Sequence, residues 1–314
     1  MAGNRPEKQT MRQLWVERVA QAPPRVRKEP LYLTLAGAEG RDVKALIDAG
    51  LIKVSEIGAI LDEDADKIVA IEADEEAFLQ LKRTIEGLDA RKDRIENLLR
   101  NESPFNWPQG EEREIFRARV VNFDFDRALV VEVREGQLAF PQLSWVAKVA
   151  EIHGHAPALD WCLMLTFQGQ VQWPSAVEDA VKKLLADNFE RTQDFSASVE
   201  KLLGPDAVSG ISGGDTDLKF SELDEQIQQC VLMTLVPKKI IEMVRGSGWC
   251  VKTHHNVRYG GTEARAPMVS FVFDFVWSAR GTTEPGTVYR ESLLDSVAGP
   301  VEIDPEGAIV PLFE

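Results

Sequence analysis

Two short polar segments, each directly after an apolar run, contain residue types that can bind a ligand or carry out chemistry. The first is GAEG at residues 37–40, between LYLTLA and a helix-like pattern that begins at Arg41. The second is NFDFD at residues 122–126, after FRARVV. A glycine turn between a strand and a helix is typical of nucleotide sites, although it can also be only a tight turn. Asparagine and aspartate oxygens at a strand end accept hydrogen bonds or form a turn.

The residues of the glycine turn distinguish among three kinds of nucleotide-binding motif. A phosphate-binding P-loop needs Lys and then Ser or Thr after its last glycine, but Gly40 is followed by Arg41 and Asp42. A dinucleotide fingerprint needs G-x-G-x-x-G, which the Gly37-x-x-Gly40 spacing fits poorly. A looser turn of small residues suits S-adenosylmethionine (SAM), because the backbone can then approach the methionine and ribose portions of that molecule.

Glu72 ends the second apolar run, KIVAIE, and precedes a helix-like segment. A carboxylate offers two acceptors, which match the two hydroxyls of a ribose. The alternative is that Glu72 only places negative charge at a helix N-terminus, which is worth a few tenths to one kcal/mol. The three acidic residues at 74–76 already fill that role, which favours the ribose interpretation.

The order of these segments over about residues 30–280 resembles the class I SAM-dependent methyltransferases. LTLAGAEG is similar to the first motif of that family, IVAIEAD to the second and VVNFDF to the fourth. The resemblance implies SAM as cofactor, bound by Ala36, Gly37, Glu39, Gly40 and Glu72. Gly37 and Glu72 lie 35 positions apart, which implies an insertion around residues 51–66. The third motif, which contacts adenine, has no assignable strand before VVNFDF.

The segment NFDF points to the acceptor side of the reaction. Amino-group methylators of the family carry Asn or Asp, two prolines and an aromatic residue here. Asn122 and Phe125 match the outer positions, whereas Phe123 and Asp124 replace the prolines. The resemblance therefore implies N-methylation of a nucleobase or another planar amine. Asn122 would accept a hydrogen bond from the amine, Phe125 would stack on the target, and Asp124 would be a second acceptor or proton sink.

Three alternatives remain open for the same residues. NFDFD is also a common strand-ending turn. Asp124-Phe125-Asp126 is a D-x-D sequence, as metal-dependent glycosyltransferases use to hold a divalent cation. The altered motifs also suit a methyltransferase-fold protein that binds a partner without methyl transfer. The pairs His153/His155 and His254/His255 have no ligands nearby in sequence that would complete a metal site, so no metal site is predicted.

The pattern of elements predicts an α/β protein with a Rossmann-like, mostly parallel sheet flanked by helices, and a C-terminal antiparallel hairpin at the sheet edge. A basic helical extension would occupy residues 1–29, the Rossmann-like domain 30–280 and a C-terminal tail 281–314. The expected helices lie at 10–22, 41–49, 75–100 and 143–152, from Ser175, and from about Leu223 to Gly246 with a kink at Pro237. The expected strands lie at 31–37, 67–74, 116–125, 159–167, 249–259 and 269–277, with loops at 101–112 and 204–217.

Composition limits the partners. The formal net charge is −15, yet residues 1–30 carry seven Lys or Arg and three Asp or Glu. Arg25, Arg27 and Lys28 form a basic patch that suits an acidic partner such as nucleic acid, or is only a solvated surface. Three isolated cysteines, the absence of a signal-peptide pattern and apolar runs much shorter than about 18 residues predict a cytoplasmic protein outside the membrane.

Overall fold

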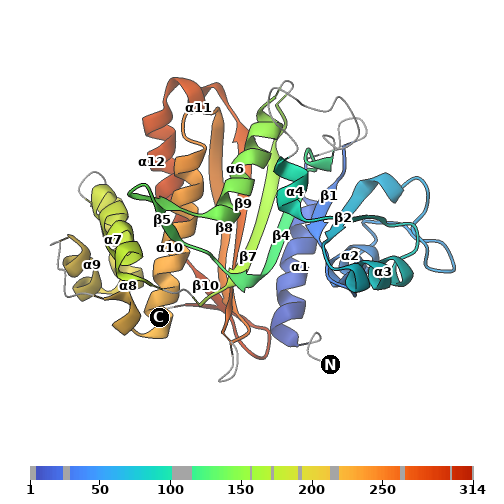
Figure 1. Ribbon diagram of the computed structural model, residues 1–314, viewed down its shortest axis with the longest axis horizontal. Helices are drawn as coiled ribbons and strands as arrows, with labels where there is room; N and C mark the ends of the chain where they lie inside the picture. The colour runs from blue at the N-terminus through green and yellow to red at the C-terminus, as the bar shows by residue number, and fades with distance from the viewer. Residues whose placement is uncertain are drawn as a thin grey trace.

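A nine-stranded sheet runs through the middle of the protein, with helices on both of its faces (Figure 1). The computed structural model describes residues 5–23, 29–100, 115–155, 158–170, 173–189, 193–212, 219–261, 266–297 and 299–312. The basic patch at 25–28 and the expected loop at 101–112 lie outside these residues.

The strand order is β11-β10-β8-β9-β7-β4-β1-β2-β3, and only β9 and β11 run opposite to the others. The predicted Rossmann-like, mostly parallel sheet is therefore confirmed. The hairpin of β8 and β9 lies where the C-terminal antiparallel pair was expected, and two short strands extend the sheet beyond it. The strands are β1 (Tyr32–Leu35), β2 (Ile68–Glu72), β3 (Asp89–Lys92), β4 (Val120–Ala128), β7 (Trp161–Gln168), β8 (Trp249–Tyr259), β9 (Met268–Trp277), β10 (Val301–Ile303) and β11 (Ile309–Pro311).

Each face of the sheet buries its own apolar core, as layered α/β proteins require. One core packs α1 (Pro6–Ala20), α2 (Arg41–Asp48) and α3 (Glu75–Thr84) against the sheet. The other core contains the remaining helices, of which α7, α8 and α9 gather beside α10, away from α2 and α3 (Figure 1). These helices are α4 (Ile95–Arg100), α6 (Pro141–Gly154), α7 (Ser175–Phe189), α8 (Gln193–Leu203), α9 (Pro205–Ser212), α10 (Glu225–Met243) and α12 (Pro285–Ser296).

The small elements complete the chain. The helix α11 (Ala279–Thr283) precedes α12, and β5 (Glu132–Arg134) pairs with β6 (Gln137–Ala139) in a separate two-stranded sheet. Residues 281–314, assigned from sequence to a tail, contain α12, β10 and β11, and β10 pairs with β8.

The topological switch point lies between β1 and β4. β1 pairs with β2 on one side and with β4 on the other, both in parallel. The helices α2 and α3 therefore cover one face of the sheet, and α4 and α6 cover the other. In open parallel sheets a crevice forms at the carboxyl ends of the strands at such a point, and ligands bind there. The sequence GAEG follows β1 and thus lies at this crevice.

Two predictions of secondary structure are wrong. The expected helix at 75–100 ends at Thr84, and β3 then forms the sheet edge. That strand is short and all four of its residues are partly exposed, so it has no apolar pattern to reveal it. The expected loop at 204–217 contains the helix α9, whose apolar side packs into the core although the segment is rich in Gly and Ser.

Other expectations hold with shifted details. The helix α1 begins at Pro6 rather than at Thr10, whose hydroxyl donates instead to the carbonyl of Gly307 over 2.8 Å. The expected insertion forms a loop in which Val54 and Ile60 make an isolated antiparallel bridge.

A side chain from β8 compensates for the proline inside α10. Pro237 has no N–H, which leaves the carbonyl of Met233 without its helical donor. Asn256 donates its Nδ2 to this carbonyl over 2.9 Å inside the core. The helix therefore continues through Pro237 because the sheet supplies the missing donor.

Asn256→Leu is expected to lower the free energy of unfolding by about 1–3 kcal/mol, because a buried carbonyl loses its donor. Adding Pro237→Ala restores a backbone donor for Met233, so the second substitution should cost less in the Asn256→Leu background than in the wild type. Urea unfolding of the four proteins measures this coupling. Strictly additive effects would show that the two residues do not share the carbonyl.

Candidate functional site

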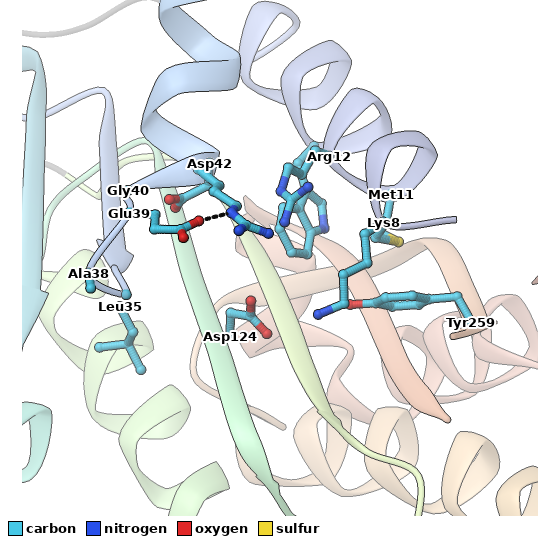
Figure 2. A pocket seen from close by; sticks show the side chains of 13 residues that line it. Lys8, Met11, Arg12, Leu35, Ala38, Glu39, Gly40, Asp42, Asp124 and Tyr259 are labelled. Carbon is cyan, nitrogen blue, oxygen red and sulfur yellow. Dashed lines mark hydrogen bonds and ion pairs between the residues drawn. The ribbon is translucent and has the colours of Figure 1, made fainter. Parts of the chain in front are cut away.

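A cavity of about 410 Å³ lies at the switch point, between the turn after β1 and the helix α1 (Figure 2). Three parts of the chain supply its walls: the end of β1 with the turn and the first residues of α2, one side of α1, and the middle of β4 with the end of β8. The lining residues are Lys8, Met11, Arg12, Trp15, Leu35, Gly37, Ala38, Glu39, Gly40, Arg41, Asp42, Asp124 and Tyr259.

The two glycines of the turn have different physical roles. Gly40 has a φ of +51°, and a Cβ there would lie 2.6 Å from Ile85 Cδ1 and 2.7 Å from Leu81 Cδ1. Gly40 is therefore required by the backbone and by packing against α3. A Cβ at Gly37 would meet nothing within 4 Å. Packing within the protein does not require a glycine there, and the backbone at Gly37 is open to the cavity.

A buried polar network lies beneath the cavity. Asn122 on β4 donates its Nδ2 to the hydroxyl oxygen of Tyr32 on β1 over 2.7 Å. The carboxylate of Asp42 accepts from the Tyr32 hydroxyl over 3.1 Å and from the Thr34 hydroxyl over 2.5 Å, both at Oδ2. Burial and the nearby Asp42 charge raise the pKa of Tyr32 well above its usual value, so this phenol stays protonated and remains a donor.

Charges of both signs surround the cavity. Lys8, Arg12 and Arg41 are cationic, and Glu39, Asp42 and Asp124 are anionic. Arg41 and Glu39 form an ion pair (Figure 2). Burial and the neighbouring Arg41 lower the pKa of Arg12, although Asp42 and Asp124 act in the opposite direction, and an arginine remains charged at neutral pH in any case. The cavity thus suits a ligand that carries both a positive and a negative group.

A cluster of ionisable side chains links the helix α1 to the strands β8 and β9 next to the cavity. Arg18 forms an ion pair with Asp274 on β9, and His254 Nε2 on β8 lies 2.6 Å from Asp274 Oδ2. Burial alone would raise the pKa of the Asp274 carboxyl, but the hydrogen bonds from His254 and Arg18 outweigh burial and lower it. Because Lys8, Arg12 and Trp15 precede Arg18 on this helix, the cluster also holds one wall of the cavity.

Asp274→Asn is expected to lower the free energy of unfolding at pH 7 by about 2–3 kcal/mol, less than for a fully buried ion pair. The folded-state pKa of this carboxyl is lowered. Its contribution is therefore complete above the unfolded-state pKa of about 3.9 and is lost as the pH falls through the folded-state value. The difference between wild type and variant in urea unfolding should shrink as the pH falls below the unfolded-state value.

Glu63→Gln is the matched control, since the Lys53–Glu63 pair is exposed on both sides and should contribute less than about 1 kcal/mol. A difference for Asp274→Asn that does not change with pH would contradict the assignment of the effect to this carboxylate.

Three of the five residues expected to bind the cofactor line the cavity: Gly37, Glu39 and Gly40. Ala36 is buried in the core under the turn. Glu72 ends β2, does not line this cavity, and accepts the backbone N–H of Asp74 with its Oε1 over 2.8 Å. The structure therefore brings the turn to the cavity, whereas the carboxylate of Glu72 serves the start of α3.

The expected acceptor-side residues separate between the two faces of β4, because successive side chains of a strand alternate. Asp124 reaches the cavity. Asn122 is on the same face but is completely buried against Tyr32, so its side chain does not line the cavity. Phe125 is on the opposite face, where its ring stacks on Phe167 at a centroid distance of 5.3 Å. Stacking of Phe125 on a substrate at this cavity is therefore incompatible with the observed packing.

Sequence reasoning missed the residues supplied by α1, α2 and β8. Lys8, Met11, Arg12 and Trp15 have the i, i+3, i+4, i+7 spacing of one helix face, which is a visible signal, but no motif links that face to the turn. Asp42 was seen only as a departure from the P-loop pattern. Tyr259 ends β8, and only the sheet order brings it to the switch point.

An open groove of about 1010 Å³ adjoins the cavity between α1 and α2. It shares Arg12, Glu39 and Arg41 with the cavity, so the Arg41–Glu39 ion pair lies on the boundary between the two spaces. Lys44 and Asp48 line the groove but not the cavity. The groove provides a second approach to the switch point, with side chains of both charges along it.

The other candidate groups show no metal centre within the described residues, where no three His, Cys, Asp or Glu side chains gather suitably. The side chain of Asp126 lies outside that set, so the D-x-D pair is not placed. His153 is fully buried and stacks on Trp161, and burial, followed by Arg117 and Arg119, lowers its pKa to about 3. In the described parts of the chain, no helix is both long and apolar enough to cross a membrane.

Comparisons with known proteins add little to this geometry. No protein-family model matches the chain, and no curated protein matches its sequence. A solved structure from Rhodobacter sphaeroides, described as one of the Zn-dependent alcohol dehydrogenases, is similar with a TM-score of 0.29 and 8% identity, over 88% of this chain and 99% of that chain. A TM-score this low supports no transfer of activity, so the cavity itself carries the functional evidence.

Proposed function

We propose that the protein is a SAM-dependent methyltransferase that methylates a nitrogen of a nucleobase or another planar amine. The observation that carries this proposal is the cavity at the carboxyl end of β1 and beside β4, where the backbone at Gly37 lies open. Ligands of open α/β sheets bind at this position, and an unobstructed glycine permits close approach of a ligand to the backbone.

The residues at the cavity fit SAM in charge and size. SAM carries a carboxylate, an ammonium group and two ribose hydroxyls. Arg12 or Lys8 can bind the carboxylate, and Asp42 or Glu39 can bind the ammonium group. The volume of about 410 Å³ lies within the range of small-molecule sites.

The order of strands also supports the resemblance on which the proposal rests. In chain order, the large sheet contains β1, β2, β3, β4 and β7, and then β8 and β9 as its sixth and seventh strands. This hairpin is similar to strands six and seven of the methyltransferase family. The short β3 supplies the strand that the sequence did not reveal between α3 and β4.

Among the described side chains of NFDFD, Asp124 is the one that can act on an acceptor at the cavity. When bound, SAM would supply the methyl group: the C–N bond to the acceptor nitrogen would form as the C–S bond breaks, with S-adenosylhomocysteine as the leaving group. Asp124 accepts a hydrogen bond from the amine and afterwards takes the proton that the methylated nitrogen releases. The groove between α1 and α2 gives the acceptor a route to this carboxylate.

Calorimetric titration with SAM and with S-adenosylhomocysteine tests the proposal. Micromolar binding of both is expected, since the cavity has fixed charges of both signs. Binding followed by formation of S-adenosylhomocysteine with an oligonucleotide or small planar amine would separate an enzyme from a binding protein with the same fold. Binding of a nucleotide-sugar that depends on a divalent metal, with no binding of SAM, would instead support the glycosyltransferase alternative.

A further inference from the structure

The carboxylate of Asp42 is held from below by side chains that have no contact with solvent. Tyr32, Thr34 and Asn122 are 1%, 0% and 0% exposed, and they come from two neighbouring strands. Asp42 belongs to the first turn of α2 and lines the cavity (Figure 2). The network therefore runs from the middle of the sheet to the wall of the ligand site.

The direction of the hydrogen bonds in this network is determined at its buried end. Asn122 Nδ2 can only donate, so the oxygen of Tyr32 is its acceptor at 2.7 Å. Tyr32 must then give its own proton to another acceptor, which is Asp42 Oδ2 at 3.1 Å. Thr34 donates to the same oxygen at 2.5 Å. Two donors thus fix Oδ2, and Oδ1 of Asp42 has no hydrogen-bond partner within the described part of the chain.

This arrangement is costly for the fold. Asn122 Oδ1 is buried without a hydrogen-bond partner among the described residues. On folding, this oxygen loses its hydrogen bonds to water and gains none within the protein, which costs free energy. Apolar side chains at positions 32, 34 and 122 would pack between the sheet and the helix without that cost. A buried polar network that the fold does not need is expected to serve a site.

We propose that Asn122 and Tyr32 are positioning residues that hold the Asp42 carboxylate toward the cavity, where Asp42 binds a protonated amine of the ligand. The inference rests on the proposed function for the identity of that amine, which is the ammonium group of the methionine portion. It gives Asn122 a role different from alignment of the acceptor, because the Asn122 side chain acts through Tyr32 and does not face the cavity.

The test compares two ligands that differ in this amine. S-adenosylhomocysteine has the amino-acid portion, whereas 5′-methylthioadenosine has the same adenosine and sulfur without it. Asp42→Asn should weaken the binding of S-adenosylhomocysteine about 10- to 100-fold, which is the range for a hydrogen bond to a charged group. The affinity for 5′-methylthioadenosine should stay within about twofold of wild type. Tyr32→Phe should give a smaller loss with the same selectivity, because Asp42 keeps Thr34 but loses one donor.

Asn122 is tested with two substitutions. In Asn122→Asp the new carboxylate accepts the hydrogen bond of the Tyr32 hydroxyl, so Asp42 loses this donor. The affinity for S-adenosylhomocysteine should then fall, whereas the affinity for 5′-methylthioadenosine should not. In Asn122→Leu the Tyr32 hydroxyl is still free to donate to Asp42, so the loss should be smaller. Selective loss in Asn122→Asp supports the proposal. If Asn122→Asp binds S-adenosylhomocysteine like the wild type and loses only turnover, the alignment role is correct and the proposal is overturned.

Failure of this inference differs from failure of the proposed function. If wild type binds S-adenosylhomocysteine and Asp42→Asn binds it equally well, the inference is overturned and the methyltransferase proposal stands. The same conclusion follows if Asp42→Asn lowers the affinity for both ligands equally. If wild type binds neither ligand, both are overturned. Melting temperatures of all variants are measured in parallel, and Tyr32→Phe, which keeps the shape of the core, provides the result if Asn122→Asp does not fold.

Discussion

Gly37→Val is expected to abolish SAM binding while leaving the melting temperature within about 2–4 °C of wild type, since any change in stability should stay below about 1 kcal/mol. A Cβ at Gly37 would meet no protein atom within 4 Å, so the fold tolerates a side chain there. The same side chain would enter the cavity beside the backbone that a ligand approaches. Calorimetry with SAM and a thermal melt of the same preparation measure the two effects.

Gly40→Ala is the matched control and should give the opposite pattern. Its positive φ and the clash with Ile85 and Leu81 should lower the stability by about 1–3 kcal/mol. Gly50→Ala, with a φ of +73° and no atom within 4 Å of the Cβ, isolates the backbone contribution. Normal binding by Gly37→Val would place the ligand elsewhere and remove the main support for the proposed site.

The elements predicted correctly from sequence are those whose burial leaves a regular apolar pattern. β1, β2 and β7 are almost wholly buried and appear as continuous apolar runs. β8 shows alternation, because only some of its side chains enter the core. These strands and the helices between them were sufficient to infer the fold class.

The elements that were missed obtain their structure from neighbours. β3 is a partly exposed edge strand whose place is set by pairing with β2 and by Gly87, where a Cβ would lie 2.9 Å from the carbonyl oxygen of Ile60. The helix α9 is stabilised by packing beside α7 and α8 rather than by helix propensity. Neither influence is visible in a local window of sequence.

The residues of the candidate site also fall into a group that could be predicted from sequence and a group that could not. The turn after β1 could be predicted because it directly follows a buried strand, and Asp124 was named although it reaches the site from inside β4 rather than after it. The α1 residues could not, because a helix far away in sequence reaches the site through tertiary packing. Asn122 shows the limit most clearly: it was expected to follow the strand, but it lies inside β4, and its side chain points to the hydroxyl of Tyr32 on the neighbouring strand.

Among the NFDFD side chains that the structure describes, Asp124 is consequently the one from which a large catalytic effect is expected. Figure 2 shows it on β4 within the cavity, between the glycine turn and Tyr259. Asp124→Asn keeps the size of the side chain and one oxygen acceptor, but removes the base that takes the proton. Turnover should fall about 10²- to 10⁴-fold, the range for a general base. Affinity for S-adenosylhomocysteine should stay within about threefold, because the substituted group acts on the acceptor.

The measurement is formation of S-adenosylhomocysteine with the best acceptor from a panel of oligonucleotides and planar amines, together with its binding constant. Asp206→Asn is the matched control, because this carboxylate on α9 lines neither the cavity nor the groove, and it should retain nearly full turnover. A proportional loss of binding and turnover in Asp124→Asn would assign Asp124 to cofactor binding instead. Loss of wild-type activity on chelation of divalent metal would favour the D-x-D interpretation, because Asp124 as a proton acceptor requires no cation.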